Sequence, residues 1–319
     1  MRPIYSGIRK FFGLKDLVVS FYTQKCRFNC TFCSLPSNSS AVPVPIENIN
    51  QQIDWVFNKY KDDLASIQQF SCGNEGSILD NERFYPESLD YLLIRCQEMT
   101  NLQVISLETR PEYITKKILE NVLQKSASKK VDVTIGLETQ DDQLRRQVLN
   151  KQFSKEMVEE KIKILGKCGV RLTSYVMVKP GPYMTEAEGI QEALATVEYL
   201  CQQCSRANVE LIIYLNPTYN AEGSNFEQIV KENGYTPPKI QSVFNIITEA
   251  QRWAVPIYTG LWSESMDRKE KDYRGREGFD LNIEKAIKNF NKTKDFSYIL
   301  AQKKQGKYFS IPSILPVGR

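Results

Sequence analysis

Histidine is absent from this chain of 319 residues, and its absence removes several classes of chemistry at once. A Ser-His-Asp hydrolase, a zinc hydrolase with imidazole ligands and a histidine proton shuttle are all excluded. Any reaction must therefore rely on Cys, Asp, Glu, Lys or Tyr side chains, or on a cofactor.

Long apolar runs and a strong charge bias are missing as well. No stretch of roughly 18 apolar residues occurs, and the N-terminal segment lacks the apolar core of a secretory signal. We therefore expect a cytoplasmic protein without membrane contact. The 42 Lys and Arg against 38 Asp and Glu leave a net charge of +4. This bias is too small to indicate nucleic-acid binding by itself, although it does not exclude it.

Short apolar, β-branched segments alternate with longer amphipathic ones between residues 17 and 217. This pattern is typical of repeated βα units around a parallel sheet. We expect six strands, at residues 17–22, 66–72, 102–108, 131–138, 171–178 and 209–215. Helices are expected between them, at residues 46–60, 86–99, 112–124, 155–168 and 186–204. A closed TIM barrel has eight such units, so the sequence predicts an α/β fold with a partial, open (β/α)6 TIM-like barrel.

The regular alternation ends near Gly223, which divides the chain into two expected parts. Residues 1–222 would form the barrel, and residues 223–319 a C-terminal extension that contacts a substrate or a partner. Within the extension we expect a helix at residues 240–253 and a strand at residues 254–259. A mixed-charge, solvated run is expected at residues 267–277, and an extended tail at residues 308–319.

Cysteine is concentrated in one place. Three of the eight cysteines, Cys26, Cys30 and Cys33, follow closely on the first expected strand with the spacing C-x3-C-x2-C. Three thiolates on one loop can hold three irons of a cubane cluster and leave the fourth iron open to a ligand. A zinc site or chance clustering is the alternative. Structural zinc takes four nitrogen or sulfur ligands, however, and this loop has no fourth cysteine close by.

With Phe32 immediately before the last cysteine, this loop resembles the signature of the radical S-adenosylmethionine (SAM) superfamily. The resemblance covers residues 17–217. It implies a catalytic 4Fe-4S cluster held by Cys26, Cys30 and Cys33, whose open iron chelates the methionine part of SAM. It also implies that an electron from the cluster cleaves SAM, and that the resulting 5′-deoxyadenosyl radical abstracts a hydrogen from the substrate.

Candidate cofactor-binding residues follow the expected strands, where barrel active sites are built. The segment Gly73-Asn74-Glu75 is similar to the Gly-Gly-Glu motif of the superfamily, with Asn74 in place of the second glycine. The resemblance implies that the backbone approaches SAM here and that Glu75 binds its amino group. An ordinary turn is the alternative. By the same resemblance Glu138 is expected to bind the SAM ribose, and Phe32 is counted with the cofactor-binding residues.

Glu108, Arg110 and Lys179 also follow expected strands. They would point into the mouth of the barrel and contact the substrate or SAM. Solvated or helix-capping side chains are the alternative, since charges at strand ends are often of that kind.

Residues 106–114, 136–140 and 177–188 resemble a narrower subgroup of the superfamily. This subgroup contains the Elongator catalytic subunit, the methylthiotransferases and the radical SAM subunit of archaeosine synthase. These relatives act largely on tRNA bases. Similar short enzymes of the splicease type instead modify ribosomally made precursor peptides.

Three functions follow as hypotheses. The leading one is splicease-like hydrogen abstraction from a precursor peptide, aided by a small recognition protein, because the chain shows no evident RNA-binding module and no strong basic stripe. Modification of a tRNA base is the second hypothesis. A non-catalytic iron-sulfur or SAM-binding sensor is the third. For either enzyme we expect an electron donor such as flavodoxin or ferredoxin.

Overall fold

The computed structural model describes residues 1–219, 221, 223–261 and 280–304. The mixed-charge run at 267–277 and the tail at 308–319 that the sequence predicts lie outside these residues. Among the described helices, none is long and apolar enough to span a membrane.

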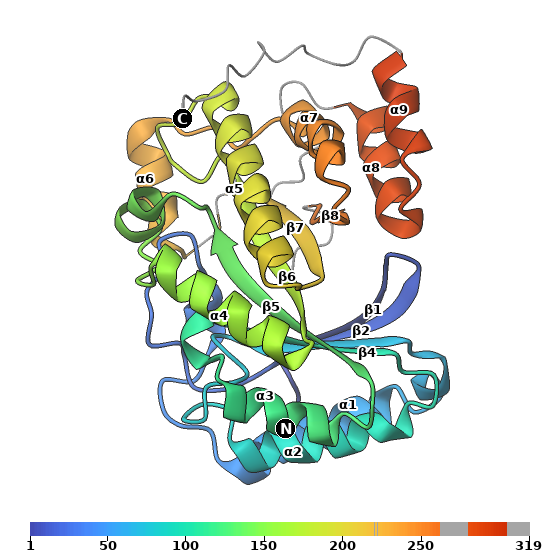
Figure 1. Ribbon diagram of the computed structural model, residues 1–319. Helices are drawn as coiled ribbons and strands as arrows, with labels where there is room; N and C mark the ends of the chain where they lie inside the picture. Colours follow the sequence, from blue (N-terminus) through green and yellow to red (C-terminus); the bar gives the residue numbers. More distant parts are fainter. Residues whose placement is uncertain (220, 222, 262–279, 305–319) are drawn as a thin grey trace.

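A curled sheet forms the centre of the described structure (Figure 1). Its eight strands are neighbours in chain order: β1 Tyr5–Phe11, β2 Leu14–Phe21, β3 Gln69–Asn74, β4 Val104–Thr109, β5 Lys130–Glu138, β6 Arg171–Val178, β7 Leu211–Pro217 and β8 Ile257–Thr259. β1 pairs antiparallel with β2, and the later neighbours pair in parallel. The predicted α/β fold with an open partial barrel is confirmed.

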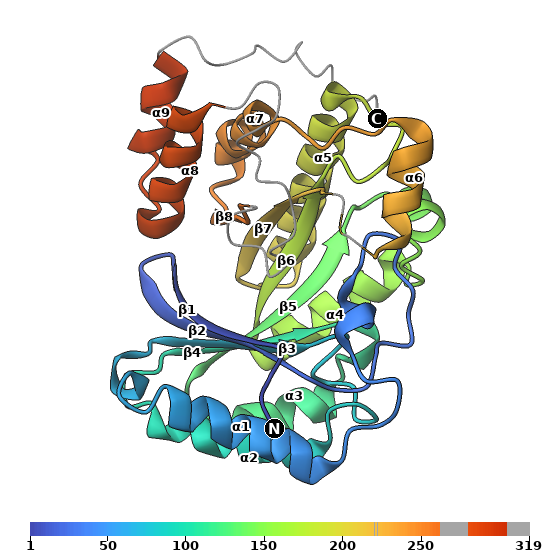
Figure 2. The ribbon, with the colours of Figure 1, turned by 180° about the vertical axis from the view of Figure 1, so that it is seen from behind.

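Helices cover the outer face of this sheet (Figures 1 and 2). Five of them follow the strands β2 to β6 in turn: α1 Ile46–Lys59, α2 Pro86–Arg95, α3 Lys116–Lys125, α4 Lys155–Cys168 and α5 Glu186–Arg206. The chain continues with α6 Asn225–Asn233, α7 Ile240–Ala250, α8 Leu281–Thr293 and α9 Ser297–Lys304. The C-terminal ends of the parallel strands therefore share one edge of the sheet, where barrel active sites lie.

The described sheet has two strands more than the six expected between residues 17 and 217, and those six correspond to β2 to β7. β1 was not predicted, because only Phe11 of its seven residues is buried and the strand carries no clear apolar alternation. β8 falls within the strand expected at residues 254–259, and it pairs with β7. The sheet thus extends beyond the predicted barrel at both edges.

The strands have two different faces. Along β4, Ile105 and Leu107 belong to the core beneath the helices, whereas Ser106 and Glu108 line the interior of the half-barrel. The same alternation recurs in β5 and β6, whose interior residues include Asp132, Thr134, Thr173 and Tyr175. Because successive side chains of a strand point to opposite faces, this pattern gives the half-barrel a polar interior.

Helix α8 lies against both edges of the sheet. The backbone N–H of Phe12 donates to the carbonyl oxygen of Asn291 at 3.2 Å. The side chain of Asn291 also exchanges hydrogen bonds with the backbone of Thr259, at 3.0 and 2.8 Å. The rings of Phe11 and Tyr258 meet at 4.7 Å between centroids. The two edge strands are therefore joined where the antiparallel hairpin turns.

Candidate active site

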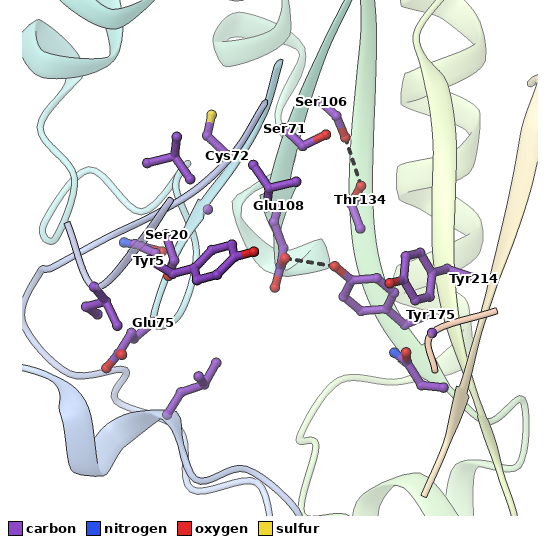
Figure 3. A pocket seen from close by; sticks show the side chains of 18 of the residues that line it. Tyr5, Ser20, Ser71, Cys72, Glu75, Ser106, Glu108, Thr134, Tyr175 and Tyr214 are labelled. Atoms are coloured by element: carbon purple, nitrogen blue, oxygen red, sulfur yellow. Dashed lines mark hydrogen bonds between the residues drawn. The ribbon is translucent and has the colours of Figure 1, made fainter. Parts of the chain in front are cut away.

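A cavity of about 940 Å³ occupies the interior of the half-barrel. Its walls carry polar side chains from neighbouring strands, as Figure 3 shows: Ser20, Ser71, Ser106, Glu108, Thr134 and Tyr175. The segment Gly73-Asn74-Glu75 lines the same cavity at the end of β3. Four predicted site residues, namely the three of this segment and Glu108, are therefore brought together.

The loop that carries the three cysteines follows β2 and is held by two other segments of the chain. The backbone N–H of Thr31 donates to the carbonyl of Leu149 at 3.0 Å, and its hydroxyl donates to the carbonyl of Val148 at 2.7 Å. The backbone N–H of Phe226 donates to the carbonyl of Thr31 at 2.8 Å. Residues far apart in the sequence thus fix the conformation of the cysteine loop.

Each of the three cysteines has a hydrogen-bond donor beside its sulfur. Arg110 donates from Nη1 to the sulfur of Cys30 at 3.7 Å. Backbone N–H groups of Phe28 and Leu35 donate to the sulfurs of Cys26 and Cys33. Burial raises the pKa of the Cys33 thiol to about 12, so this thiol keeps its proton until a metal displaces it. This donor set suits an anionic iron-sulfur cluster, whose sulfurs are stabilised by such bonds.

The turn after β3 approaches the cysteine loop closely. A Cβ atom built on Gly76 would lie 3.2 Å from the Cβ atom and 3.4 Å from the sulfur of Cys26. Within the described part of the chain, no three Cys, Asp or Glu side chains gather as ligands of a single metal ion. A cubane cluster instead takes each thiolate on a separate iron.

Glu75 is a buried carboxylate with spare hydrogen-bonding capacity. Its side chain belongs to a residue that is 1% exposed, and Oε2 accepts a hydrogen bond from the hydroxyl of Ser39. Oε1 is buried without a hydrogen-bond partner. Burial raises the pKa of Glu75 to about 8, because the charged form loses its solvation. A ligand ammonium group would supply both the missing donor and the missing charge, which fits the predicted contact with SAM.

Glu138 lies next to a cation that the sequence did not reveal. Nζ of Lys151 is 3.0 Å from Oε1 of Glu138, and both side chains are buried. A Cβ atom on Gly136 would collide with both of these groups, so glycine provides the space for the ion pair. Lys151 also lies 5.5 Å above the ring of Phe32. Lys151 therefore contacts both Glu138, the residue expected to bind the ribose, and Phe32 of the cysteine loop. Glu138 and Lys151 are not among the residues that line the cavity.

The three predicted substrate contacts lie in three different settings. Glu108 lines the cavity and accepts a hydrogen bond from the phenol of Tyr175 at 2.8 Å. Arg110 stacks on the ring of Phe28, with its guanidinium carbon 3.5 Å from the ring centroid, and bonds to the cysteine loop. Lys179 donates to the carbonyl of Thr236 at 2.7 Å. Of these three residues, only Glu108 is part of the cavity wall.

Several residues of the cavity were missed at the level of sequence. Tyr175 and Thr173 face the interior from β6, and Asp132 accepts hydrogen bonds there from Ser106 at 2.7 Å and Arg171 at 2.6 Å. The usable signal was the polar residue at every second position of otherwise apolar strands. Lys151 had no such signal, because it lies in a loop 13 residues beyond its partner.

The comparisons with known proteins point to one family. Residues 20–194 match the family model of the Radical SAM superfamily. This match covers more than half of the chain, and the chain belongs to that superfamily. It is accordingly a radical SAM enzyme, with a 4Fe-4S cluster and SAM as its cofactors.

Two curated relatives and one solved structure are informative. An uncharacterized protein of Methanocaldococcus jannaschii is 26% identical over 245 residues, which make up 75% of this chain and 65% of that protein. Archaeosine synthase subunit beta of Thermococcus kodakarensis is 24% identical over 290 residues, covering 88% of this chain and 84% of that protein. SuiB of Streptococcus suis, bound to its precursor peptide SuiA, has a TM-score of 0.53. That likeness covers 88% of this chain and 55% of the other at 13% identity, so it concerns the fold alone.

Proposed function

We propose that this protein uses radical SAM chemistry to modify a nucleoside of tRNA. The observation that carries the proposal is the distant homology to archaeosine synthase subunit beta, which extends over 88% of this chain and 84% of that relative. The precursor-peptide hypothesis led on sequence alone, but its support among the comparisons is a likeness of fold. A tRNA nucleoside therefore replaces the precursor peptide as the leading candidate substrate. The sensor hypothesis ranks last, because the chain matches the radical SAM superfamily over residues 20–194.

The cavity has features that suit a nucleobase. Aromatic side chains of Tyr5, Tyr175 and Tyr214 line it beside the hydroxyls of Ser71 and Ser106. Unstacked bases bind to aromatic faces and to hydrogen-bonding groups along their edges. A base that is turned out of an RNA helix presents both features to an interior site of this kind.

SAM supplies the radical chemistry when it is bound, and the residues of this chain hold and orient it. Cys26, Cys30 and Cys33 would bind the cluster, with Arg110 fixing the loop beside Cys30. Gly73 and Asn74 would allow close approach of the backbone, and Glu75 would receive the amino group of SAM. Glu138, whose charge is balanced by Lys151, would face the ribose.

We also propose two protein partners. The relative from Thermococcus kodakarensis is named as a subunit, which supports a partner subunit for this chain that contributes to RNA recognition. Reductive cleavage of SAM needs a one-electron donor, for which flavodoxin or ferredoxin is suitable.

The test uses anaerobically reconstituted protein with SAM and dithionite. One reaction receives tRNA from the source organism, and a parallel reaction receives peptides encoded beside the gene. We expect a mass change in one nucleoside of digested tRNA, and no change with the Cys30→Ala variant. A modified peptide together with unchanged tRNA would reverse the proposal. Formation of no 5′-deoxyadenosine in any reaction would favour the sensor.

A further inference from the structure

Tyr175 lies in the wall of the cavity with its phenol directed at a carboxylate (Figure 3). Its hydroxyl donates to Oε2 of Glu108 at 2.8 Å. Glu108 in turn covers Gly73, since a Cβ atom built there would lie 3.0 Å from the Cβ atom of Glu108. A continuous line of contact therefore runs from the segment expected to bind SAM, through Glu108, to the phenol of Tyr175.

A second tyrosine of the cavity has different surroundings. The ring of Tyr214 meets that of Tyr175 edge to face, with 5.1 Å between centroids. Its phenol oxygen, however, accepts a hydrogen bond from Nη1 of Arg9 at 3.3 Å, and the guanidinium also lies 5.8 Å above its ring. A carboxylate can exchange a proton with a phenol, whereas a guanidinium cannot accept one. Tyr175 has, in Glu108, a partner that supports hydrogen transfer.

We propose that Tyr175 is a further catalytic residue, which donates a hydrogen atom to a carbon radical formed in the cavity. The proposal rests on the radical SAM chemistry of this protein, and it does not depend on tRNA as the substrate. A phenolic O–H bond is weaker than an unactivated C–H bond, so the transfer to an alkyl radical is downhill. This weak bond lies in the wall of the cavity that Gly73, Asn74 and Glu75, the segment expected to bind SAM, also line.

The step balances in atoms and electrons. The O–H bond of Tyr175 breaks homolytically, a C–H bond forms at the carbon radical, and a neutral tyrosyl radical remains. That radical returns to the phenol by taking one electron and one proton. The electron comes from the low-potential, one-electron donor that also reduces the cluster. The proton comes from solvent through the carboxyl group of Glu108, whose oxygen is already at hydrogen-bond distance.

The experiment measures the incorporation of deuterium into 5′-deoxyadenosine and needs no substrate. Reconstituted protein with its cluster is exchanged into D2O and given SAM and dithionite without RNA, and 5′-deoxyadenosine is analysed by mass spectrometry. Phenols exchange with D2O, whereas carbon-bound hydrogens do not. We expect the wild type to form a singly deuterated product. In Tyr175→Phe the deuterated fraction should fall at least tenfold, and Tyr183→Phe, whose residue is 77% exposed, should match the wild type.

A second variant keeps the phenol and removes its proton source. In Glu108→Gln, deuteration should stop near one equivalent per enzyme, because the tyrosyl radical is no longer reprotonated. The fraction is normalised to total 5′-deoxyadenosine, so partial loss of active protein does not alter it. A deuterated fraction in Tyr175→Phe within twofold of the wild type would overturn the proposal. Loss of deuterium in Cys72→Ser alone would also overturn it, since Cys72 contributes to the cavity wall and carries a second exchangeable hydrogen, although its side chain packs in the core.

The outcome is separable from that of the proposed function. The assay contains no RNA, so failure to modify tRNA leaves the result for Tyr175 unchanged. If the wild type forms no 5′-deoxyadenosine, the radical chemistry is contradicted, and the role of Tyr175 with it.

Discussion

Glu75 is a carboxyl group whose burial disfavours its charged form as long as no cationic ligand is bound. Its carboxylate is buried, one oxygen has no hydrogen-bond partner, and no described cation lies within ion-pair distance of it. Burying a carboxylate in this way favours its protonated form. A ligand cation would stabilise the ionised form, so SAM binding is coupled to loss of this proton.

Replacing Glu75 with Gln should weaken SAM binding at least tenfold, because a charge-assisted hydrogen bond becomes a neutral one. The measurement is equilibrium dialysis with labelled SAM on reconstituted protein. Glu82→Gln is the matched control, since the side chain of Glu82 is 76% exposed. Equal SAM affinity in the Glu75 variant and the wild type would contradict the assignment of Glu75.

The pKa of Glu75 predicts a pH dependence with a definite sign. The folded protein without SAM holds this proton up to a pH of about 8, whereas the ordinary value of the pKa is 4.5. Between these values the folded state binds more protons than the unfolded chain, so stability falls as the pH rises. SAM affinity should rise over the same interval, because the ligand cation prefers ionised Glu75. Thermal melts of the wild type and Glu75→Gln across this range test the trend in stability. The same melts with SAM added test the trend in SAM affinity.

The hairpin of β1 and β2 has a structural role that the sequence of β1 did not predict. β1 is an edge strand, and its last residue, Phe11, is buried against Tyr258 at the opposite edge of the sheet. Arg9 of the same strand forms an ion pair with Asp16 of β2 at 2.8 Å. The hairpin thus joins the two edges of the half-barrel and adds a polar pair to its interior.

Truncating Phe11 to Ala should lower the free energy of unfolding by about 3 to 4 kcal/mol, because a buried aromatic ring is lost and a cavity remains. Urea unfolding measures the change. Ile8→Ala in the same strand is the control: this residue is 38% exposed, and we expect a change within about 0.5 kcal/mol. Similar losses in the two variants would show that the contact of Phe11 with Tyr258 does not stabilise the barrel.

At the scale of the whole molecule, the barrel and the C-terminal extension share a core. Phe244 and Ile247 of α7 are fully buried in the cluster that also contains Val197 of α5 and Leu172 of β6. Phe226 follows the predicted boundary at residue 222 by only a few positions, and its backbone bonds to the cysteine loop. We therefore expect residues 1–222 and 223–319 to fold together.

A chain that ends at residue 222 should fail to hold a stable cluster, because part of the core and one support of the cysteine loop are removed. Iron and sulfide content after anaerobic reconstitution, with the full chain treated in parallel, measures this loss. Far-UV circular dichroism shows whether the helices form. A truncated chain that binds a full cluster and cleaves SAM would establish the barrel as an independent unit.

The sequence by itself determined the features that depend on short range. The six strands β2 to β7 follow from local apolar periodicity, and the proposed cluster ligands Cys26, Cys30 and Cys33 follow from their spacing within one loop. Both signals lie within a few consecutive residues, so no tertiary contact is needed to read them.

The tertiary structure alone decided which residues meet. Arg110 reaches Cys30 across 80 residues of sequence, and Tyr175 reaches Glu108 across 67. Strand register and the curvature of the sheet set these pairings, and neither can be predicted from a short stretch of sequence. For this reason the sequence did not predict that Arg110 lies beside Cys30, and Tyr175 was expected only as part of a strand.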